Sequence, residues 1–345
     1  MIIECLTKEE AERIINEIKR LFPNYIFNFE INSNYSSIVY LIINGNIDVI
    51  TNDILKEINA KCAFSSLEQS LFFVTNKGSL TTFDIGSRTY HPNDGLITMI
   101  AGPCEIESFT DLYETASALK ECGVSVFRAM PRKPRTSPYN FQGVGDIGWK
   151  YLYEIKNKLG LPILAEVFSQ EEIDLALHYD IDIIQIGARN MQNYDLIKRA
   201  ANSGITTVLK KGMWCNNEQL LKAAEYFFVY GKGNVILAER GIQTHESSTR
   251  NTFDLSSIHY LKNKTNQPVM ADASHGTGVR NMVIPINCAS VLMGADVIEV
   301  EVHINPDKTI KPGDYYQMLT INEYRELLVQ LRQIMGIRQL AFDFE

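Results

Sequence analysis

Apolar residues near the start of the chain repeat with the period of a helix. A T-x-x-E capping box at Thr7 and Glu10 precedes the repeat, and Pro23 follows it. Residues three or four positions apart share one side of a helix, so the pattern predicts an amphipathic helix that ends before the proline. Its apolar positions are Ala11, Ile14, Ile18 and Leu21.

Stretches rich in β-branched and aromatic residues surround this helix. Residues 37–44 and 71–75 are predicted strands, and the order over residues 1–90 is strand, helix, strand, strand, helix, strand. That order suits a small α+β sandwich of ferredoxin-like type. Residues 76–95 are rich in Gly, Ser, Thr, Asn and Asp, and we predict a linker there. The first domain is therefore expected to span residues 1–90.

From residue 96 onward, short apolar runs alternate with helical patterns. Eight strand–helix pairs in about 245 residues are typical of a (β/α)8 TIM barrel, an α/β fold, and we predict one over residues 91–345. A doubly wound open sheet is the alternative, but no Gly-rich first turn supports it. The predicted strands are 97–101, 124–129, 163–167, 183–186, 207–210, 235–238, 269–271 and 297–302, and helical patterns include 111–121, 171–178, 218–228 and 281–292.

Composition narrows the class of protein. Of the 345 residues, 45% are hydrophobic and 21% charged, which is a globular composition. A net charge of −8 without a long basic run argues against nucleic-acid binding, and no apolar run is long enough to span a membrane. Six Cys without a CxxC pair do not form a disulfide scaffold, and the N-terminus does not resemble a signal peptide. We expect a reduced, cytoplasmic protein.

Six cationic residues stand at successive ends of the predicted strands. In a barrel the carboxyl ends of the strands and the loops that follow them form the active-site face. Any one of these cations could be a solvated surface residue, but six at one mouth of an acidic protein predict a ligand with more than one phosphate or carboxylate. They are Arg128, Lys133, Arg135, Arg189, Lys210 and Arg240.

A thiol, an imidazole and a carboxylate stand at the ends of three further strands. Cys104, His275 and Glu301 belong to the first, seventh and eighth predicted strands, which closure makes neighbours. This donor set suits a borderline divalent ion such as Zn, Mn, Fe or Co. Glu299 and His303 share a face of the last strand with Glu301. The remaining cysteines are interpreted as structural: Cys5, Cys62, Cys122, Cys215 and Cys288.

An ordered set of motifs resembles one enzyme family. AGPC, KPRTSPYNFQG, IGARN, LKKGM, ERG, SHGTG and EVH, in this order on a barrel, resemble the metal-dependent 3-deoxy-D-arabino-heptulosonate 7-phosphate (DAHP) synthases of type I-beta, which carry a ferredoxin-like regulatory domain. The resemblance implies condensation of phosphoenolpyruvate (PEP) with erythrose 4-phosphate, the first step of the shikimate pathway to chorismate and the aromatic amino acids. It also implies a homo-oligomer, a tetramer in the family, and an aromatic amino acid as effector.

The resemblance also implies roles for single residues. The PEP ligands would be Arg128, Lys133, Arg189, Lys210 and Arg240, and those of erythrose 4-phosphate Lys133, Pro134, Arg135, Thr136 and Ser137. The catalytic group would comprise Lys133, Cys104, His275 and Glu166, with Glu166 orienting the water that adds at C2. The metal ligands would be Cys104, His275, Glu301 and Asp314. Pro312 occupies the position of the family's Asp ligand, and Asp314 is expected to replace it.

Three departures from the family pattern keep other functions open. Besides Pro312, the loop after Arg128 reads AMPR and adds Arg132, and GIQTHES carries Gln243 and His245 where the family has Arg and Phe. The first alternative is condensation of PEP with another aldose phosphate, such as arabinose 5-phosphate. The second, of another class, is a regulatory paralogue that binds ligands without turnover.

Overall fold

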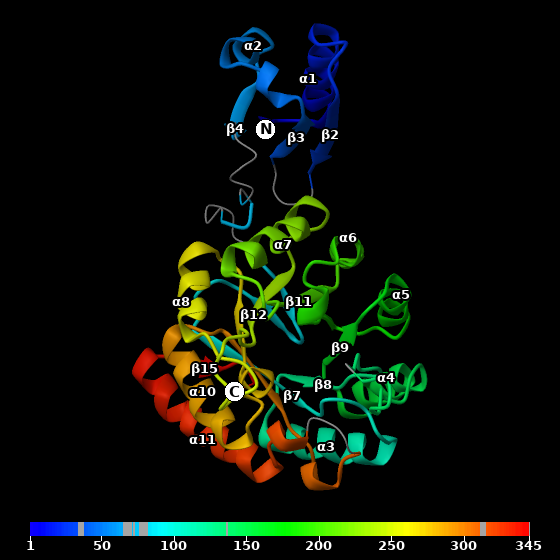
Figure 1. The fold of residues 1–345 in the computed structure, drawn as a ribbon, viewed down its shortest axis with the longest axis vertical. Helices are drawn as coiled ribbons and strands as arrows, with labels where there is room; N and C mark the ends of the chain where they lie inside the picture. Colours follow the sequence, from blue (N-terminus) through cyan, green and yellow to red (C-terminus); the bar gives the residue numbers. More distant parts are fainter. Residues whose placement is uncertain are drawn as a thin grey trace.

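The computed structural model describes residues 1–33, 38–64, 71, 73–75, 82–135, 137–310 and 315–344. Strands in these residues form a closed barrel, a four-stranded antiparallel sheet and a two-stranded hairpin. Figure 1 shows the four-stranded sheet and its helices at one end of the molecule, beside helix α7 of the barrel. No helix in the described part of the chain combines the length and apolar character needed to cross a membrane.

Eight parallel strands build the barrel. The last pairs with the first, with Glu301 opposite Gly102, and this pairing excludes an open sheet. All eight predicted strands are confirmed within one or two residues at each end. They are β7 (Leu96–Gly102), β8 (Val126–Arg128), β9 (Ile163–Val167), β10 (Ile183–Ile186), β11 (Thr206–Lys210), β12 (Val235–Glu239), β13 (Val269–Asp272) and β14 (Val297–Glu301).

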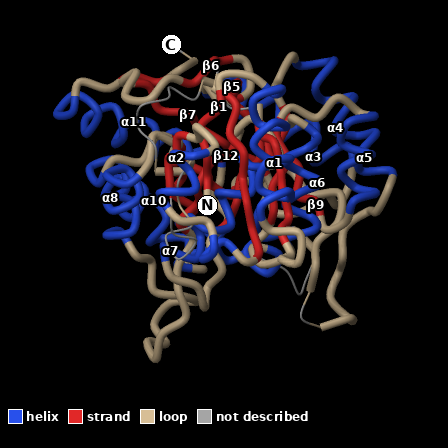
Figure 2. Tube along the Cα trace, turned by 90° about the horizontal axis from the view of Figure 1, so that it is seen from above, coloured by secondary structure: helices blue, strands red, loops and turns tan. Residues whose placement is uncertain are grey.

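Helices surround these strands, as the view from above shows (Figure 2). The helical patterns predicted from the sequence all fall within observed helices. The helices are α3 (Phe109–Cys122), α4 (Ile147–Leu159), α5 (Gln170–His178), α6 (Tyr194–Ser203), α7 (Asn217–Val229), α8 (Leu255–Lys264), α9 (Ala273–Thr277), α10 (Arg280–Met293) and α11 (Ile321–Arg338). Short 3-10 turns are η1 (Ile47–Val49), η2 (Ala188–Asn190), η3 (Pro306–Lys308) and η4 (Tyr315–Gln317), and β15 (Ala341–Phe342) pairs with β7.

The first part of the chain has the predicted ferredoxin-like arrangement. The sheet order β2-β3-β1-β4 is antiparallel, and its core contains Ile3, Ile14, Ile18, Leu41 and Ile43, separate from the barrel core. The predicted order of elements is therefore confirmed. These elements are β1 (Ile2–Cys5), α1 (Lys8–Leu21), β2 (Phe27–Asn32), β3 (Val39–Gly45), α2 (Asn52–Glu57) and β4 (Lys61–Phe64).

The capping box before α1 differs from the prediction in one contact. Thr7 Oγ1 accepts a hydrogen bond from the Glu10 amide at 3.2 Å, as expected. The Glu10 carboxylate, however, accepts from the amide of Leu6 at 2.7 Å, one residue before the expected donor. The helix still begins where the pattern places it, because one orphan amide of its first turn is satisfied.

The strand predicted over residues 71–75 is wrong. Residues 73–75 form a turn, and the amides of Phe73 and Val74 both donate to the Glu225 carboxylate of α7, each at 2.8 Å. An apolar run predicts burial, but it does not identify the partner of the backbone. Here a carboxylate on a barrel helix takes the place of a neighbouring strand.

The linker predicted over residues 76–95 contains a hairpin. Strands β5 (Phe83–Ile85) and β6 (Arg88–Tyr90) pair, and Phe83, Ile85 and Tyr90 pack among inward-facing barrel residues such as Ile100 and Val208. Thr206 Oγ1 at the start of β11 donates to the Asp84 carbonyl at 2.6 Å. The hairpin thus covers the amino ends of the barrel strands. We propose that the domain boundary lies before this hairpin rather than at residue 90.

Candidate active site

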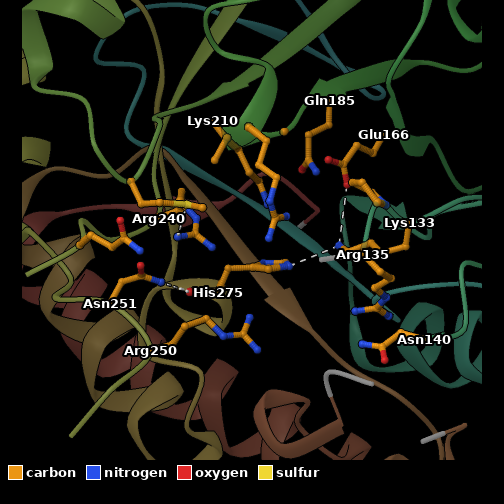
Figure 3. Close-up of a pocket in the computed structure, with 16 residues that line it drawn as sticks. Lys133, Arg135, Asn140, Glu166, Gln185, Lys210, Arg240, Arg250, Asn251 and His275 are labelled. Carbon is orange, nitrogen blue, oxygen red and sulfur yellow. Dashed lines mark hydrogen bonds and ion pairs between the residues drawn. The ribbon is translucent and has the colours of Figure 1, made fainter. Parts of the chain in front are cut away.

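A cavity of about 370 Å³ opens at the carboxyl ends of the barrel strands. Figure 3 shows side chains from several strands and their following loops pointing into it. Eight of the residues that the sequence singled out line this cavity, so the structure brings them together at one mouth of the barrel. They are Lys133, Pro134, Arg135, Glu166, Arg189, Lys210, Arg240 and His275.

Backbone geometry at two glycines sets the shape of the site. Gly102, which ends β7 ahead of Cys104, has a φ of +153°, and a Cβ there would lie 2.0 Å from the Arg128 carbonyl oxygen. At Gly187, after β10, a Cβ would lie 2.0 Å from Glu166 Oε1. A side chain at Gly102 would collide with fixed backbone, so glycine is required there, whereas a side chain at Gly187 would push the Glu166 carboxylate out of its place.

Arg128 does not lie where the resemblance implied. Its side chain is fully buried and forms ion pairs with Glu299 and, at 3.4 Å, with Glu301; it is not among the residues that line the cavity. The two carboxylates need a buried counter-charge beneath the site, because an unpaired charge there would be costly. Arg128 thus lies beneath the lining of the cavity, and a direct contact with PEP stays a prediction.

Lys210 binds two buried carboxylates, one of which also contacts His275. Its Nζ lies 2.6 Å from Asp272 and 2.9 Å from Glu299, and Asp272 lies 2.8 Å from His275 Nδ1. Burial acts to raise the pKa of Asp272, but His275 and Lys210 outweigh it and hold that pKa well below its usual range. An ionised Asp272 can only accept hydrogen bonds, so Nδ1 of His275 must carry a proton. In the neutral ring Nε2 then has no proton and is the nitrogen that can bind a metal ion.

Three of the four residues predicted to bind a metal are brought together. Cys104, His275 and Glu301 are buried, and one donor atom from each lies within 4.8 Å of the other two. His275 Nε2 lies 3.1 Å from Glu301 Oε1, and burial lowers the pKa of His275, which favours the neutral ring that metals require. Asp272 on Nδ1 fixes the orientation of the ring. The donor set fits a divalent ion.

A second group of donors shares the same histidine. Asp272, His275 and Glu299 also lie within 4.8 Å of one another. However, Asp272 and Glu299 both bind Lys210, and Glu299 also pairs with Arg128. These cations closely compensate both carboxylates of this second group, whereas Glu301 meets Arg128 only at 3.4 Å, so the group with Cys104 is the better metal site.

Lys133 lies between the metal group and the cavity. Its Nζ is 3.5 Å from His275 Nε2 and 3.7 Å from Glu166 Oε2. Burial acts to lower the pKa of Lys133, but Cys104, Glu166 and Glu301 outweigh it and raise that pKa above its usual value. Lys133 is therefore a protonated ammonium at neutral pH.

Arg135 is held by a residue that the sequence did not single out. Its guanidinium pairs with Glu105, and its Nε donates to the Phe141 carbonyl at 3.1 Å. Burial raises the pKa of Glu105, partly offset by Arg135. The predicted phosphate-binding loop is thus anchored at its arginine.

Other predicted residues lie away from the cavity or outside the described residues. Ser137 forms a turn in which its Oγ accepts from the Tyr139 amide at 3.4 Å, and it does not line the cavity. Thr136 and Asp314, together with Pro312, lie outside the described residues. His303 binds the Asn305 amide through Nδ1 at 2.9 Å and is not part of the metal group.

The cavity is also lined by six polar or sulfur-containing residues that the sequence analysis did not place there. Gln185 stands inside the apolar strand β10, where a polar residue among isoleucines is the signal that could have identified it. Gln243 was noted only as a departure from the family pattern. The six are Asn140, Gln185, Met213, Gln243, Arg250 and Asn251.

Comparisons with known proteins agree with this geometry. Residues 71–338 match the DAHP synthetase I family. The chain is 39% identical over 267 residues to a phospho-2-dehydro-3-deoxyheptonate aldolase of Thermotoga maritima, covering 74% of this chain and 78% of that one. It is 31% identical to a 2-dehydro-3-deoxyphosphooctonate aldolase of Desulfosudis oleivorans, covering 72% and 92%.

Similarity to solved structures extends over the small sheet as well. The crystal structure of the Thermotoga maritima phospho-2-dehydro-3-deoxyheptonate aldolase (DAHP synthase) covers 99% of both chains with a TM-score of 0.74 and 32% identity. A truncated form of the Thermotoga enzyme covers 79% of this chain and all of its own, with a TM-score of 0.72 and 34% identity. From its sequence match, its barrel and its similarity to these structures, the chain belongs to the DAHP synthetase I family.

Proposed function

We propose that this protein is a 3-deoxy-7-phosphoheptulonate synthase, the enzyme of the first step of the shikimate pathway. It joins PEP, D-erythrose 4-phosphate and water to give DAHP and inorganic phosphate. The observation that carries the proposal is one cavity lined by Lys133, Arg135, Arg189, Lys210 and Arg240, beside the buried Cys104–His275–Glu301 group. Two anionic substrates repel each other, so a site that joins them needs concentrated positive charge.

The cations divide into two groups along the chain. Arg189 on η2 after β10, Lys210 at the end of β11 and Arg240 just after β12 would hold the phosphate and carboxylate of PEP. Lys133, Pro134 and Arg135 come from the loop after β8 and would hold the aldose phosphate, with Thr136 and Ser137 of the same loop. Arginine offers a bidentate fork for such groups, whereas lysine acts as a point charge.

The residues suit the required bond changes. C3 of PEP bonds to the aldehyde carbon, whose oxygen takes up a proton that the Lys133 ammonium can supply. Water then adds to C2 and gives a proton to a carboxylate such as Glu166. The C2–O bond to phosphate then breaks, the remaining proton of the new C2 hydroxyl passes to the leaving phosphate, and the ketone forms. Developing charge at C2 is stabilised by the fixed cations around it.

A divalent metal ion would be held by Cys104, His275 and Glu301, and would polarise the aldehyde carbonyl. Mn, Fe, Co and Zn all suit this donor set. We propose Asp314 as a fourth metal ligand. It would replace the family's Asp ligand, whose position is occupied by Pro312 in this chain. Replacing Asp314 by Ala should then weaken metal binding in a metal titration, and replacing Pro312 by Ala should not. Equal metal affinity in the Asp314 variant and the wild type would leave a three-ligand site.

The test is phosphate release from PEP with erythrose 4-phosphate, run with and without EDTA. Release should require the aldose and should be lost with the chelator and restored by a divalent ion. Arabinose 5-phosphate serves as the second aldose, because several relatives that are 28–31% identical are named 2-dehydro-3-deoxyphosphooctonate aldolase. Preference for arabinose 5-phosphate would support that alternative, and no release with either aldose would support a non-catalytic paralogue.

We further propose that the small sheet and its helices form a regulatory domain that responds to an aromatic amino acid. The proposal rests on the resemblance and on the separate core of one face of the small sheet. The other face, with Ile2, Tyr40 and Ile42, packs with the barrel core. A ligand that binds one arrangement of the two parts better than another would shift their populations. We also propose that the protein forms a homo-oligomer, which the resemblance suggests is a tetramer. We propose a cytoplasmic location as well.

A further inference from the structure

Gln185 is a buried polar residue of the cavity to which no role has yet been given. It lies on β10 between Ile184 and Ile186, it lines the cavity, and only 1% of its surface is exposed. Among the described residues its Oε1 has no hydrogen-bond partner. A buried acceptor left unsatisfied costs about 1–3 kcal/mol, so a bound molecule with a donor is expected at this atom.

The neighbours of Gln185 include a charged pair that is not in direct hydrogen-bond contact. Gln185 is the register partner of Glu166 on β9, and Figure 3 shows both side chains directed into the cavity. Glu166 Oε2 lies 3.7 Å from Lys133 Nζ, which is beyond hydrogen-bonding distance. A water that binds both atoms would therefore lie beside the pair rather than between its members. Gly187, which has no side chain, leaves room for the Glu166 carboxylate.

The hydrogen-bonding chemistry of Gln185 Oε1 limits which molecule can bind to it. Oε1 accepts hydrogen bonds only, so its partner must donate. The phosphate and carboxylate of PEP are acceptors at neutral pH and cannot fill this role. Water can, and it needs two to four polar partners to be held in a buried position. Oε1 of Gln185, the Glu166 carboxylate and the Lys133 ammonium together supply them.

We infer that Gln185, Glu166 and Lys133 hold the water molecule that adds to C2 of PEP. The inference deepens the proposed function and rests on it. The water donates one hydrogen bond to Gln185 Oε1 and one to Glu166, and accepts one from Lys133. Its remaining lone pair is then directed at C2. As the oxygen bonds to C2, the proton that faces Glu166 passes to that carboxylate, and Gln185 keeps the molecule oriented.

The first experiment is a crystal structure of the wild-type protein with PEP. An ordered water should lie about 2.7–3.2 Å from both Gln185 Oε1 and Glu166. The same structure of Gln185→Met, which has a similar length without the amide, should lack it. A wild-type site in which Gln185 binds PEP directly, or in which no water contacts Oε1, would overturn the inference. This outcome does not depend on which aldose the enzyme uses.

The second experiment separates binding from chemistry. In Gln185→Met, kcat should fall about ten-fold, as expected for one lost hydrogen bond in the transition state, while the Kd for PEP stays within about two-fold. Gln330→Met, on helix α11, is the matched control and should change neither value. An equal loss of PEP affinity would make Gln185 a PEP ligand, and a rise confined to the aldose KM would make it an aldose ligand. Each result would overturn the water role.

The two experiments also distinguish this inference from the proposed function. If the wild-type protein releases no phosphate with either aldose, the proposed function fails, and the crystal structure with PEP still decides whether Gln185 binds a water. If the wild-type protein is active and the water is absent, the function stands and the inference fails.

Discussion

Single residues in this site act through buried pairs of opposite charge. Lys210 lies against Asp272 and Glu299, and Arg128 against Glu299 and Glu301. Removing either cation would leave two buried carboxylates with one counter-charge fewer, which is more damaging than the loss of one ligand contact. A Lys210→Ala variant would therefore confuse stability with PEP binding. Arg189 is partly exposed and gives a cleaner measurement.

We predict that Arg189→Ala raises the Kd for PEP about ten-fold or more. A charge-assisted hydrogen bond contributes about 1.5–3 kcal/mol, which corresponds to that change. Isothermal titration with PEP measures it. The matched control is Arg132→Ala, since Arg132 is 48% exposed and pairs with Asp146 outside the cavity. Equal PEP affinity in the two variants would show that Arg189 is not a ligand.

We predict that Cys104→Ala loses bound metal and turnover while keeping its fold. The substitution removes the soft donor and leaves only a small cavity. Elemental analysis gives the metal content, and thermal unfolding gives the stability. Cys288→Ala, which changes a buried cysteine on α10, should keep both metal and activity. Full metal occupancy without Cys104 would contradict the ligand assignment.

At the scale of elements, helix α7 joins the first part of the chain to the barrel. Its Glu225 carboxylate accepts from Phe73 and Val74, and its last carbonyls, at Phe228 and Val229, accept from Asn32 Nδ2 at 2.7 and 3.0 Å. Asn32 ends β2 of the small sheet. Carbonyls at a helix end have no partner within the helix, so Asn32 satisfies groups that would otherwise need water.

We predict that Glu225→Ala releases the turn at residues 73–75. Loss of an ionised acceptor leaves two backbone amides without a partner, so hydrogen exchange at Phe73 and Val74 should rise about ten-fold or more. Amide exchange followed by mass spectrometry measures this. Glu218→Ala on the same helix is the control, because its side chain is 61% exposed. Unchanged protection at residues 73 and 74 would show that packing, not the carboxylate, holds the turn.

At the scale of the whole molecule, the two ends of the barrel differ: one opens into the site and the other is covered. The carboxyl ends of its strands carry the charged site, and the amino ends are covered by the hairpin of β5 and β6. The hairpin precedes the barrel in sequence but belongs to its core. A truncation that removes the hairpin would therefore destabilise the barrel.

We predict that deletion of residues 1–70 leaves a stable barrel and deletion of residues 1–90 does not. The longer deletion exposes the contacts of Phe83, Ile85 and Tyr90, each worth about 1.5–3 kcal/mol. The melting temperature should therefore differ between the two proteins by about 10 °C or more. Equal melting temperatures would show that the hairpin adds nothing to the barrel.

The shorter deletion also tests regulation. We predict that Tyr or Phe inhibits the full-length enzyme and does not inhibit the protein that lacks residues 1–70. Steady-state rates with each of Tyr, Phe and Trp measure this, and the metal-loaded barrel without effector is the reference. A full-length enzyme that is insensitive to all three would refute the regulatory proposal. Inhibition that persists after the deletion would place the effector elsewhere.

The sequence alone was sufficient for the course of the barrel strands and for eight of the residues that line the cavity. Alternation of apolar runs and helical patterns located every barrel strand, because burial on both faces of a parallel strand leaves a continuous apolar run. The residue after such a run lies at the active-site face, so Glu166, Arg189, Lys210 and His275 could be assigned there. The neighbouring places of Cys104 and Glu301 followed from closure of eight strands.

Tertiary structure decided which partner each side chain meets. Position at a strand end does not fix whether a cation points into the cavity, as Arg189 does, or beneath it, as Arg128 does. The Glu105–Arg135 pair, the bond from Glu225 to the turn at residues 73–75 and the packing of the hairpin join residues far apart in sequence. Local patterns report burial and period, whereas such pairings depend on the three-dimensional path of the whole chain, and only the folded structure contains that information.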